Sequence, residues 1–156
     1  MITEEQNNQI AELIREIVAK MGIDCQVAIE QNIQGNVFNI ASSDSKLLIG
    51  QRGNNLHALQ LLAGTIAYRK LQITDRFSVD VDDYKKKREW FLRETAKRAL
   101  EQVKRTHQPV SLEPMAAYER RIVHAYLSED YSVETESVGA EPNRKIVIKP
   151  KPRGMI

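Results

Sequence analysis

A pair of glycines, Gly50 and Gly53, interrupts a stretch of the chain whose two flanks both have helical patterns. Residues 44–49 lead into the pair, and a longer apolar pattern follows from about residue 54 to residue 70. Glycine has no Cβ and adopts positive φ angles readily, so it permits a sharp turn between two helices. The sequence therefore predicts two consecutive helices joined by a very short loop.

The residues of this loop suit the binding of phosphate groups. A glycine loop at a helix N-terminus leaves backbone N–H groups accessible to an anion. Arg52 adds a cation and Gln51 a hydrogen-bond donor, and no acidic residue lies in the loop. Gly-x-x-Gly is a common pattern, so its weight comes from the helical patterns on both sides. In the plainer alternative the glycines make a tight turn, and Ile49 and Leu56 are ordinary core residues.

The first half of the chain reads as helix, strand, strand, helix, helix and strand. Thr3 and Gln6 form a capping-box pattern ahead of a helix that Gly22 ends. Residues 25–29 and 37–41 alternate as two strands around a turn. Phe77, Val79 and Val81 are the inward residues expected of a third strand, with Ser78, Asp80 and Asp82 outward. The inner side of the 54–70 helix is expected to carry Leu56, Leu59, Leu62, Ala63 and Ile66.

The second half is expected to fold as helices on a small, mainly antiparallel sheet. A long charged helix spans about residues 83–106, an extended piece 110–112, and a further helix 115–128. Two strands, 131–138 and 144–149, close the chain. The fold class is α/β (α+β), with domains at 1–83 and 84–156. The buried side of the long helix is expected to contain Trp90, Leu92, Ala96, Ala99, Leu100 and Val103.

The composition limits the kinds of function. A formal net charge of +2 means that nucleic-acid binding must depend on local basic patches. No apolar stretch approaches the ~20 residues that span a bilayer, and the acidic N-terminus is unlike a signal peptide. We therefore expect no membrane insertion and a cytoplasmic location. The single cysteine, Cys25, is expected to be a buried structural thiol, and no cofactor or metal is expected.

The order of elements in residues 1–83, with Ile-Gly-x-x-Gly between paired helices, resembles a KH domain of the bacterial (type II) topology. In KH domains the glycine loop clamps about four nucleotides of a single strand, and the bases lie in an apolar groove. The resemblance implies that Gly50, Gln51, Arg52 and Gly53 hold phosphates, flanked by Ile49 and Asn54. Ile40 and Leu56 would form part of the groove with Ile49.

A second motif lies in the run Glu119-Arg120-Arg121-Ile122-Val123-His124. Arg120 and His124 are four residues apart, so they share a helix face. With Pro114-Met-Ala-Ala-Tyr ahead of it and residues 135–148 after it, this run resembles the R-3-H domain. An Arg fork suits phosphate, and His donates to phosphate or stacks on a base. In the plainer alternative His124 hydrogen-bonds a neighbouring strand and holds the helix in place. His57 and His107 are isolated and expected at the surface.

A KH domain followed directly by an R-3-H domain resembles the Jag family, the SpoIIIJ-associated RNA-binding proteins. The resemblance covers nearly the whole chain. Many members carry a further N-terminal domain and a linker, whereas this sequence begins at the expected KH helix. The family association also implies pairing with a small KH protein and a role in cell-envelope and division control.

Two clusters of basic residues remain open to two interpretations. Lys85, Lys86, Lys87 and Arg88 begin the long helix, where positive charge opposes the helix dipole. The cluster contacts nucleic acid or is a solvated helix face. The same two alternatives apply to the basic tail of Lys149, Lys151 and Arg153.

These features together predict a non-catalytic protein that binds single-stranded RNA, with single-stranded DNA as an open alternative ligand. The second hypothesis is a protein-binding adaptor that pairs with another KH protein or with an envelope or insertase partner. A nuclease is the weakest hypothesis, because Asp80, Asp82 and Asp83 are better explained as a helix cap. The RNA motif and the oligomeric state do not follow from the residues.

Overall fold

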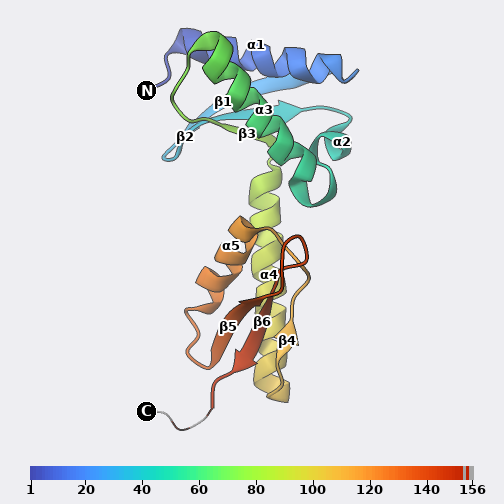
Figure 1. The fold of residues 1–156 in the computed structure, drawn as a ribbon, viewed down its shortest axis with the longest axis vertical. Helices are drawn as coiled ribbons and strands as arrows, with labels where there is room; N and C mark the ends of the chain where they lie inside the picture. Colours follow the sequence, from blue (N-terminus) through green and yellow to red (C-terminus); the bar gives the residue numbers. More distant parts are fainter. Residues whose placement is uncertain (153, 155–156) are drawn as a thin grey trace. The chain divides into compact units, whose positions relative to one another are not determined.

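The computed structural model describes residues 1–152 and 154, which form two compact units, Met1–Lys85 and Lys86–Ile156 (Figure 1). The first unit contains α1 (Glu4–Lys20), β1 (Gln26–Asn32), β2 (Gly35–Ala41), α2 (Ser45–Ile49), the 3-10 turn η1 (Gln51–Gly53), α3 (Asn54–Leu71) and β3 (Ser78–Val81). α4 (Tyr84–Thr106) begins two residues before the boundary, and β4 (Val110–Ser111), α5 (Ala117–Leu127), β5 (Val133–Val138) and β6 (Lys145–Pro150) follow it. The predicted α/β class and order of elements are confirmed.

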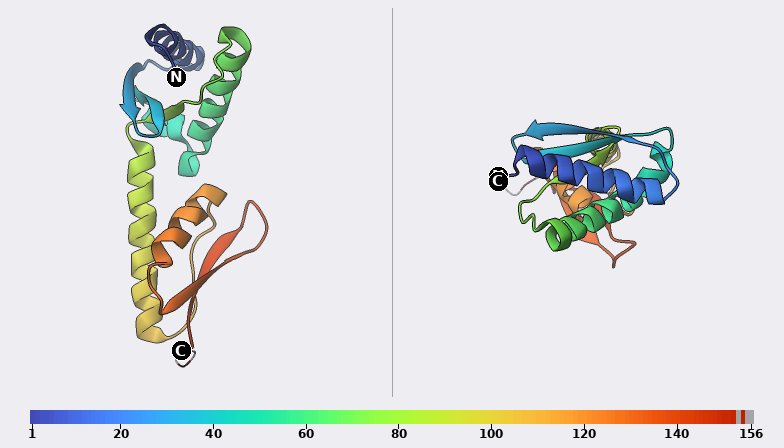
Figure 2. Two further views of the ribbon diagram at one scale, coloured as in Figure 1. Left: turned by 90° about the vertical axis from the view of Figure 1, so that its left-hand side faces the viewer. Right: turned by 90° about the horizontal axis from the view of Figure 1, so that it is seen from above.

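The first sheet has the strand order β1-β2-β3. β1 and β2 pair antiparallel, with Ile29 opposite Phe38, whereas β2 and β3 pair parallel, with Phe38 beside Val79. α1 and α3 lie side by side on one face of this sheet (Figure 2, right). That face is apolar because Phe38 and Ile40 of β2 alternate with half-buried residues. The Phe38 ring also contacts the Phe77 ring edge-on, with centroids 5.4 Å apart.

The first helix begins where the sequence predicted. The Thr3 hydroxyl accepts the Gln6 N–H at 3.2 Å, and the Gln6 side chain accepts the Thr3 N–H at 3.0 Å. This reciprocal pair satisfies two N–H groups that the first turn leaves without helical partners. The helix ends beside Gly22, whose φ of +76° is the left-handed angle typical of a helix end.

The second unit has its own sheet and its own core. Its strand order is β4-β6-β5, and both pairings are antiparallel. α4 and α5 run beside this sheet (Figure 2, left). The buried side chains come from both helices and from the sheet with its flanking residues, and they include Leu92, Ala96, Val103, Leu112, Val123, Leu127, Ile146 and Ile148. The predicted helices-on-sheet arrangement of this half is confirmed.

Four expectations about burial are wrong, and one of them concerns Cys25, which is half-buried and not buried. Trp90 is 66% exposed, because it lies about 200° around α4 from Leu92, which starts the buried stripe. Leu62 is exposed at the edge of the α3 stripe made by Leu56, Leu59, Ala63 and Ala67. Asp80 is buried in β3, where alternation predicted an outward side chain. Its carboxylate accepts the N–H groups of Val81 and Lys85, so it turns toward the start of α4.

Two further observations concern the chain as a whole. Among the described residues, no helix combines the length and the apolar character that crossing a bilayer requires. Arg153, the last cation of the predicted basic tail, lies outside the described residues, and the other two are placed at the end of β6 and just after it.

Candidate nucleic-acid interface

The loop between α2 and α3 is held in a conformation that glycine alone adopts easily. Gly50 and Gly53 have φ angles of +70° and +79°, and Arg52 between them has a φ of +55°. A Cβ added at Gly50 would lie 2.5 Å from the Asn55 Cγ, and one added at Gly53 would lie 2.8 Å from the Tyr84 ring. Backbone angle and close packing therefore both require the two glycines.

The middle of this loop presents its side chains to solvent. Gln51, Arg52 and Asn54 are exposed, whereas Gly53 is buried. The Asn55 side-chain amide donates to the Leu47 carbonyl at 2.8 Å, which ties the beginning of α3 to α2. A rigid turn thus carries two exposed polar side chains and one exposed cation.

The N-terminus of α3 adds an unblocked helix end to this loop. Its N-cap, Gly53, makes no side-chain capping bond, and the first turn contains no acidic residue. The first N–H groups of a helix, together with its dipole, attract an anion when no side chain caps them. The loop and the helix end therefore favour phosphate at the same place.

The prediction of an apolar groove beside the loop is wrong for two of its three residues, because they are buried. Ile40 and Leu56 lie inside the core of the first unit, where they offer no surface to a base. Ile49 is half-buried and packs against that core. The plainer alternative, that Leu56 is an ordinary core residue, is the correct one for this side chain.

The basic cluster at the start of α4 is divided by the fold. The Lys85 ammonium donates to Gln60 Oε1 and to Ser78 Oγ, both at 2.7 Å. Burial lowers the pKa of Lys85, and the negative charge of Asp80 opposes this shift in part. Lys86 and Lys87 are exposed. Lys85 is exposed as well, but its ammonium is held by two residues of the first unit.

Arg120 is an interior cation with two partners. It is 8% exposed, and its guanidinium donates to the Met115 carbonyl and to Glu141 Oε1, each at 2.6 Å. Glu141 comes from the loop between β5 and β6, and its own side chain is mostly exposed. In this arrangement an acidic side chain already occupies the anion position of the Arg120 fork.

The neighbouring Glu119 holds the start of α5. It is 1% exposed and accepts from Arg88 Nε at 2.7 Å and from the Ala116 N–H at 3.1 Å. The charge of a buried carboxylate is compensated when a cation and a helix N–H both bind it. Arg88, whose side chain is 18% exposed, therefore contributes to packing.

His124 contacts the second sheet through a side chain. Its Nδ1 lies 2.5 Å from Thr135 Oγ1 on β5. Burial lowers the pKa of His124, and the positive charge of Arg120 lowers it further. Both effects favour the neutral imidazole. His124 reaches the neighbouring strand as the plainer alternative expected, although through a hydroxyl and not the backbone.

The acidic residues near the start of α4 serve the local structure. Asp80 accepts the Lys85 N–H at 3.3 Å, Asp82 accepts the Ser45 hydroxyl, and Asp83 accepts the Asn39 side-chain amide at 3.0 Å. Within the described part of the chain, no group of three His, Cys, Asp or Glu residues is arranged to hold a metal ion.

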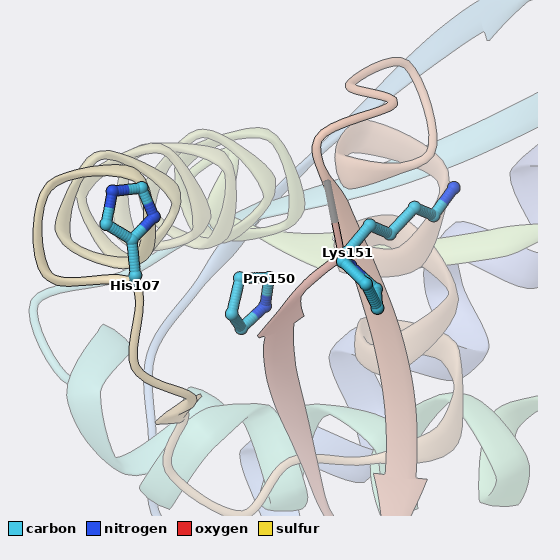
Figure 3. A pocket seen from close by; sticks show the side chains of 4 residues that line it. His107, Pro150 and Lys151 are labelled. Carbon is cyan, nitrogen blue, oxygen red and sulfur yellow. The ribbon is translucent and has the colours of Figure 1, made fainter. Parts of the chain in front are cut away.

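A hollow beside the C-terminal end of α4 lacks convergent polar groups. It measures about 360 Å³ and is lined by His107, Pro150, Lys151 and Pro152. In Figure 3 the Lys151 ammonium points away from the His107 ring. His107 is at the surface, as expected, and so is His57.

Sequence reasoning did not find the residues that support these motifs. Tyr84 and Asn55 hold the glycine loop, Glu141 binds Arg120, and Thr135 binds His124. Motif spacing carries no signal for such partners, because they come from other elements. Glu141 and Thr135 lie in the stretch of residues 135–148 that resembles the R-3-H domain. That resemblance did not show that they bind Arg120 and His124.

Comparison with known proteins agrees with the motifs. The family model of the R-3-H domain matches residues 91–150. The RNA-binding protein KhpB of Clostridium symbiosum is 34% identical over 150 residues, which cover 95% of this chain and 68% of that protein. The chain belongs to the KhpB family. The predicted resemblance to the Jag family is thereby confirmed.

Other members of the KhpB family are longer relative to this chain. The RNA-binding protein KhpB of Lactiplantibacillus plantarum is 30% identical over 132 residues, and that of Bacillus subtilis is 32% identical over 127 residues. The matched segments cover 85% and 80% of this chain but 41% and 61% of those relatives.

Proposed function

We propose that this KhpB-family chain binds single-stranded RNA in the cytoplasm, without catalysis, through the loop of residues 49–54. The observation that carries the proposal is the uncapped N-terminus of α3 beneath the exposed Gln51, Arg52 and Asn54, with no acid in its first turn. The names of the relatives, RNA-binding protein KhpB, support the choice of ligand. The KH-like order of elements supports a single strand over a duplex.

Additional phosphate contacts are assigned to the second unit. We assign them to Lys86 and Lys87, which are exposed, and to Arg120 and His124. A phosphate that reaches Arg120 takes the place of the Glu141 carboxylate, since both need the same donor. Lys85 contributes less, because its ammonium already has two oxygen partners.

The test keeps both glycines, because replacing either would strain the loop itself. The variant Gln51→Asp/Arg52→Asp makes the middle of the loop strongly negative. Its control is Gln31→Asp/Arg76→Asp, an exposed pair near the β1–β2 turn with the same charge change. Each Lys or Arg that neutralises a phosphate adds about 0.7 to the slope of log affinity against log salt for single strands.

We expect the loop variant to bind RNA more weakly and with a shallower salt slope than the control variant. Fluorescence anisotropy with labelled single-stranded RNA, single-stranded DNA and duplex RNA measures both quantities. Circular dichroism checks that each variant is folded. Equal binding by the loop variant and its control would reject the loop as the binding site.

A second candidate function, the protein-binding adaptor, is favoured by one feature of α3. Leu61 and Tyr68 are seven residues apart and both exposed, and Leu62 beside them is exposed as well. An exposed apolar helix face is a common protein-docking surface. The variant Leu61→Ser/Tyr68→Ser should then abolish association with a small KH protein while RNA binding is unchanged. Sedimentation of the mixed proteins measures the association.

A further inference from the structure

The chain's single tryptophan lies on the solvent side of a helix. Trp90 is 66% exposed, and the buried stripe of α4, which starts at Leu92, lies on the opposite side. Burial of an aromatic side chain stabilises a folded protein, so an indole on the solvent side of a helix is unusual. Nothing in the packing of the second unit requires Trp90.

The residues around Trp90 on this helix face are mainly cationic. Lys86 is four residues before it, and Arg93 and Lys97 are three and seven residues after it, so all three lie on the same face. All three side chains are exposed. Glu94, four residues after Trp90, is the one acid among these positions and is half-buried. The indole is therefore a flat apolar ring in a locally positive surface.

This face does not have the pattern of a helix that docks onto a protein or a membrane. Such a helix carries a continuous apolar stripe at i, i+3, i+4 and i+7. Here the positions that accompany Trp90 are Lys86, Arg93, Glu94 and Lys97. Trp90 and its neighbour Phe91, which is 47% exposed, are two rings among cations. Such a surface suits a partner that is itself flat and attached to negative charge, such as a nucleobase with its phosphates.

A hollow between α4 and α5 lies next to the Trp90 face of α4. The hollow measures about 530 Å³. Arg93, which lies on the same face of α4 as Trp90, borders the hollow and pairs with Glu89 at 2.8 Å. Tyr118 and Arg121 line the hollow from α5. Tyr118 is 44% exposed. Two Tyr, two Arg and two Glu side chains therefore line this hollow beside Trp90, the acids being Glu89 and Glu129.

We propose that the Trp90 face of α4 and the adjoining α4–α5 hollow form a second contact surface for the bases of a single strand. A base stacks on the Trp90 indole, and Lys86 and Lys97 neutralise the phosphates beside it. Tyr118 stacks a further base in the hollow. This inference rests on the proposed RNA-binding function. It shares Lys86 with the phosphate contacts proposed above and is separate from the loop of residues 49–54 and from Arg120 and His124.

Trp90 is also the reporter for its own test, because all tryptophan emission from the full chain comes from this residue. Titration with single-stranded RNA should quench that emission as anisotropy of the labelled RNA rises. Base stacking on an aromatic ring is worth ~1–3 kcal/mol, so Trp90→Leu should weaken binding by at least about fivefold. Its salt slope should stay unchanged, because no charge is lost.

Three further variants separate stacking from other effects. Trp90→Tyr keeps a ring and should bind close to the native affinity. Lys86→Gln/Lys97→Gln should make the salt slope shallower. Tyr131→Leu, which removes an exposed ring elsewhere in the same unit, should bind as the native chain does. The high exposure of Trp90 means that its replacement leaves the fold intact, which circular dichroism verifies.

The two ways of failing are distinguishable. If the native chain binds RNA through its glycine loop but Trp90 emission is unaffected and Trp90→Leu binds equally well, the Trp90 surface is overturned and the proposed function stands. If the native chain binds no RNA at any salt concentration, the proposed function fails and the Trp90 surface fails with it.

Discussion

At the scale of single residues, the Arg120 fork shows how a motif side chain is already engaged in the free protein. Two of its nitrogens donate to Met115 and Glu141, and the second of these partners stands on an exposed loop. The carbonyl partner fixes the side chain, whereas the carboxylate partner has the charge of a phosphate. Exchange of Glu141 for phosphate therefore changes one contact and preserves the other.

Glu141→Gln should strengthen RNA binding if Arg120 contacts a phosphate. The substitution keeps an oxygen near the guanidinium but removes the competing negative charge, so we expect a gain of about threefold to tenfold, comparable to the net worth of one hydrogen bond. Titration by anisotropy measures it. The control is Glu113→Gln, the same charge change at another exposed site. Equal gains in both variants would assign Arg120 to the structure alone.

His124 predicts a specific dependence of stability on pH. Its pKa in the folded chain is lowered from the ordinary value of 6.5. As pH falls through 6.5, the unfolded chain therefore takes up a proton that the folded chain does not, and the free energy of unfolding decreases. The decrease continues down to the lowered folded-state pKa and is absent above pH 7.

The variant His124→Gln keeps a hydrogen-bonding group near Thr135 and removes the titration. Urea unfolding between pH 8 and pH 5 should show the native chain losing stability relative to this variant as pH falls. His57→Gln, at an exposed position of α3, is the control and should follow the native curve. Parallel curves for the native chain and His124→Gln would show that His124 is not the group responsible.

At the scale of elements, α3 has a glycine at its N-cap and another in its interior, with opposite requirements. The N-cap Gly53 has a φ of +79°, and a Cβ there would meet the Tyr84 ring at 2.8 Å. Gly64 lies inside the helix, and a Cβ there would have no neighbour within 4 Å. One position needs glycine, and the other only loses helix propensity by having it.

Gly53→Ala should lower the free energy of unfolding by about 1–3 kcal/mol, because of the left-handed angle and the contact with Tyr84. Gly64→Ala should raise it by about 0.5–1 kcal/mol. Urea unfolding of both variants measures the expected decrease and the expected increase in the free energy of unfolding. A neutral Gly53→Ala would mean that the loop relaxes easily, which contradicts a rigid phosphate-binding turn.

The same elements show what the sequence could and could not predict. The Thr3 cap and the turn at Gly50 and Gly53 were predictable, because each depends on neighbours within a few residues. The exposure of Trp90 was predictable too, because helical periodicity places it about 200° around α4 from Leu92, and counting this large apolar ring among the buried residues was the error. The burial of Asp80 and the pairing of Arg120 with Glu141 depend on contacts between elements, which no local pattern records.

At the scale of the whole molecule, two compact units each offer candidate contacts for a strand. A second contact on the same strand is intramolecular, so it adds affinity without a new encounter in solution. A KH-type loop alone holds about four nucleotides. The length of the RNA therefore tests whether both units bind one strand.

Affinity should rise steeply once the RNA is longer than about four nucleotides, the length that a KH-type loop holds. The rise should exceed the statistical gain from the larger number of binding registers. In Gln51→Asp/Arg52→Asp this excess should disappear, because only one unit still binds. Anisotropy across the length series, with the Gln31→Asp/Arg76→Asp control, measures it. An excess that survives in the loop variant would show that the units do not share a strand.

The parallel pairing of β2 with β3 has a consequence for the time at which binding becomes available during synthesis. Val37 pairs with Ser78, and the whole of α2, η1 and α3 lies between these partners. The β1–β2 hairpin needs only nearby residues, whereas the third strand closes a long loop of chain and joins late. Tyr84, which packs beneath Gly53, follows that strand. A nascent chain thus exposes its glycine turn before the parts that fix it have left the ribosome, and the proposed RNA-binding loop is complete when the first residues of α4 emerge.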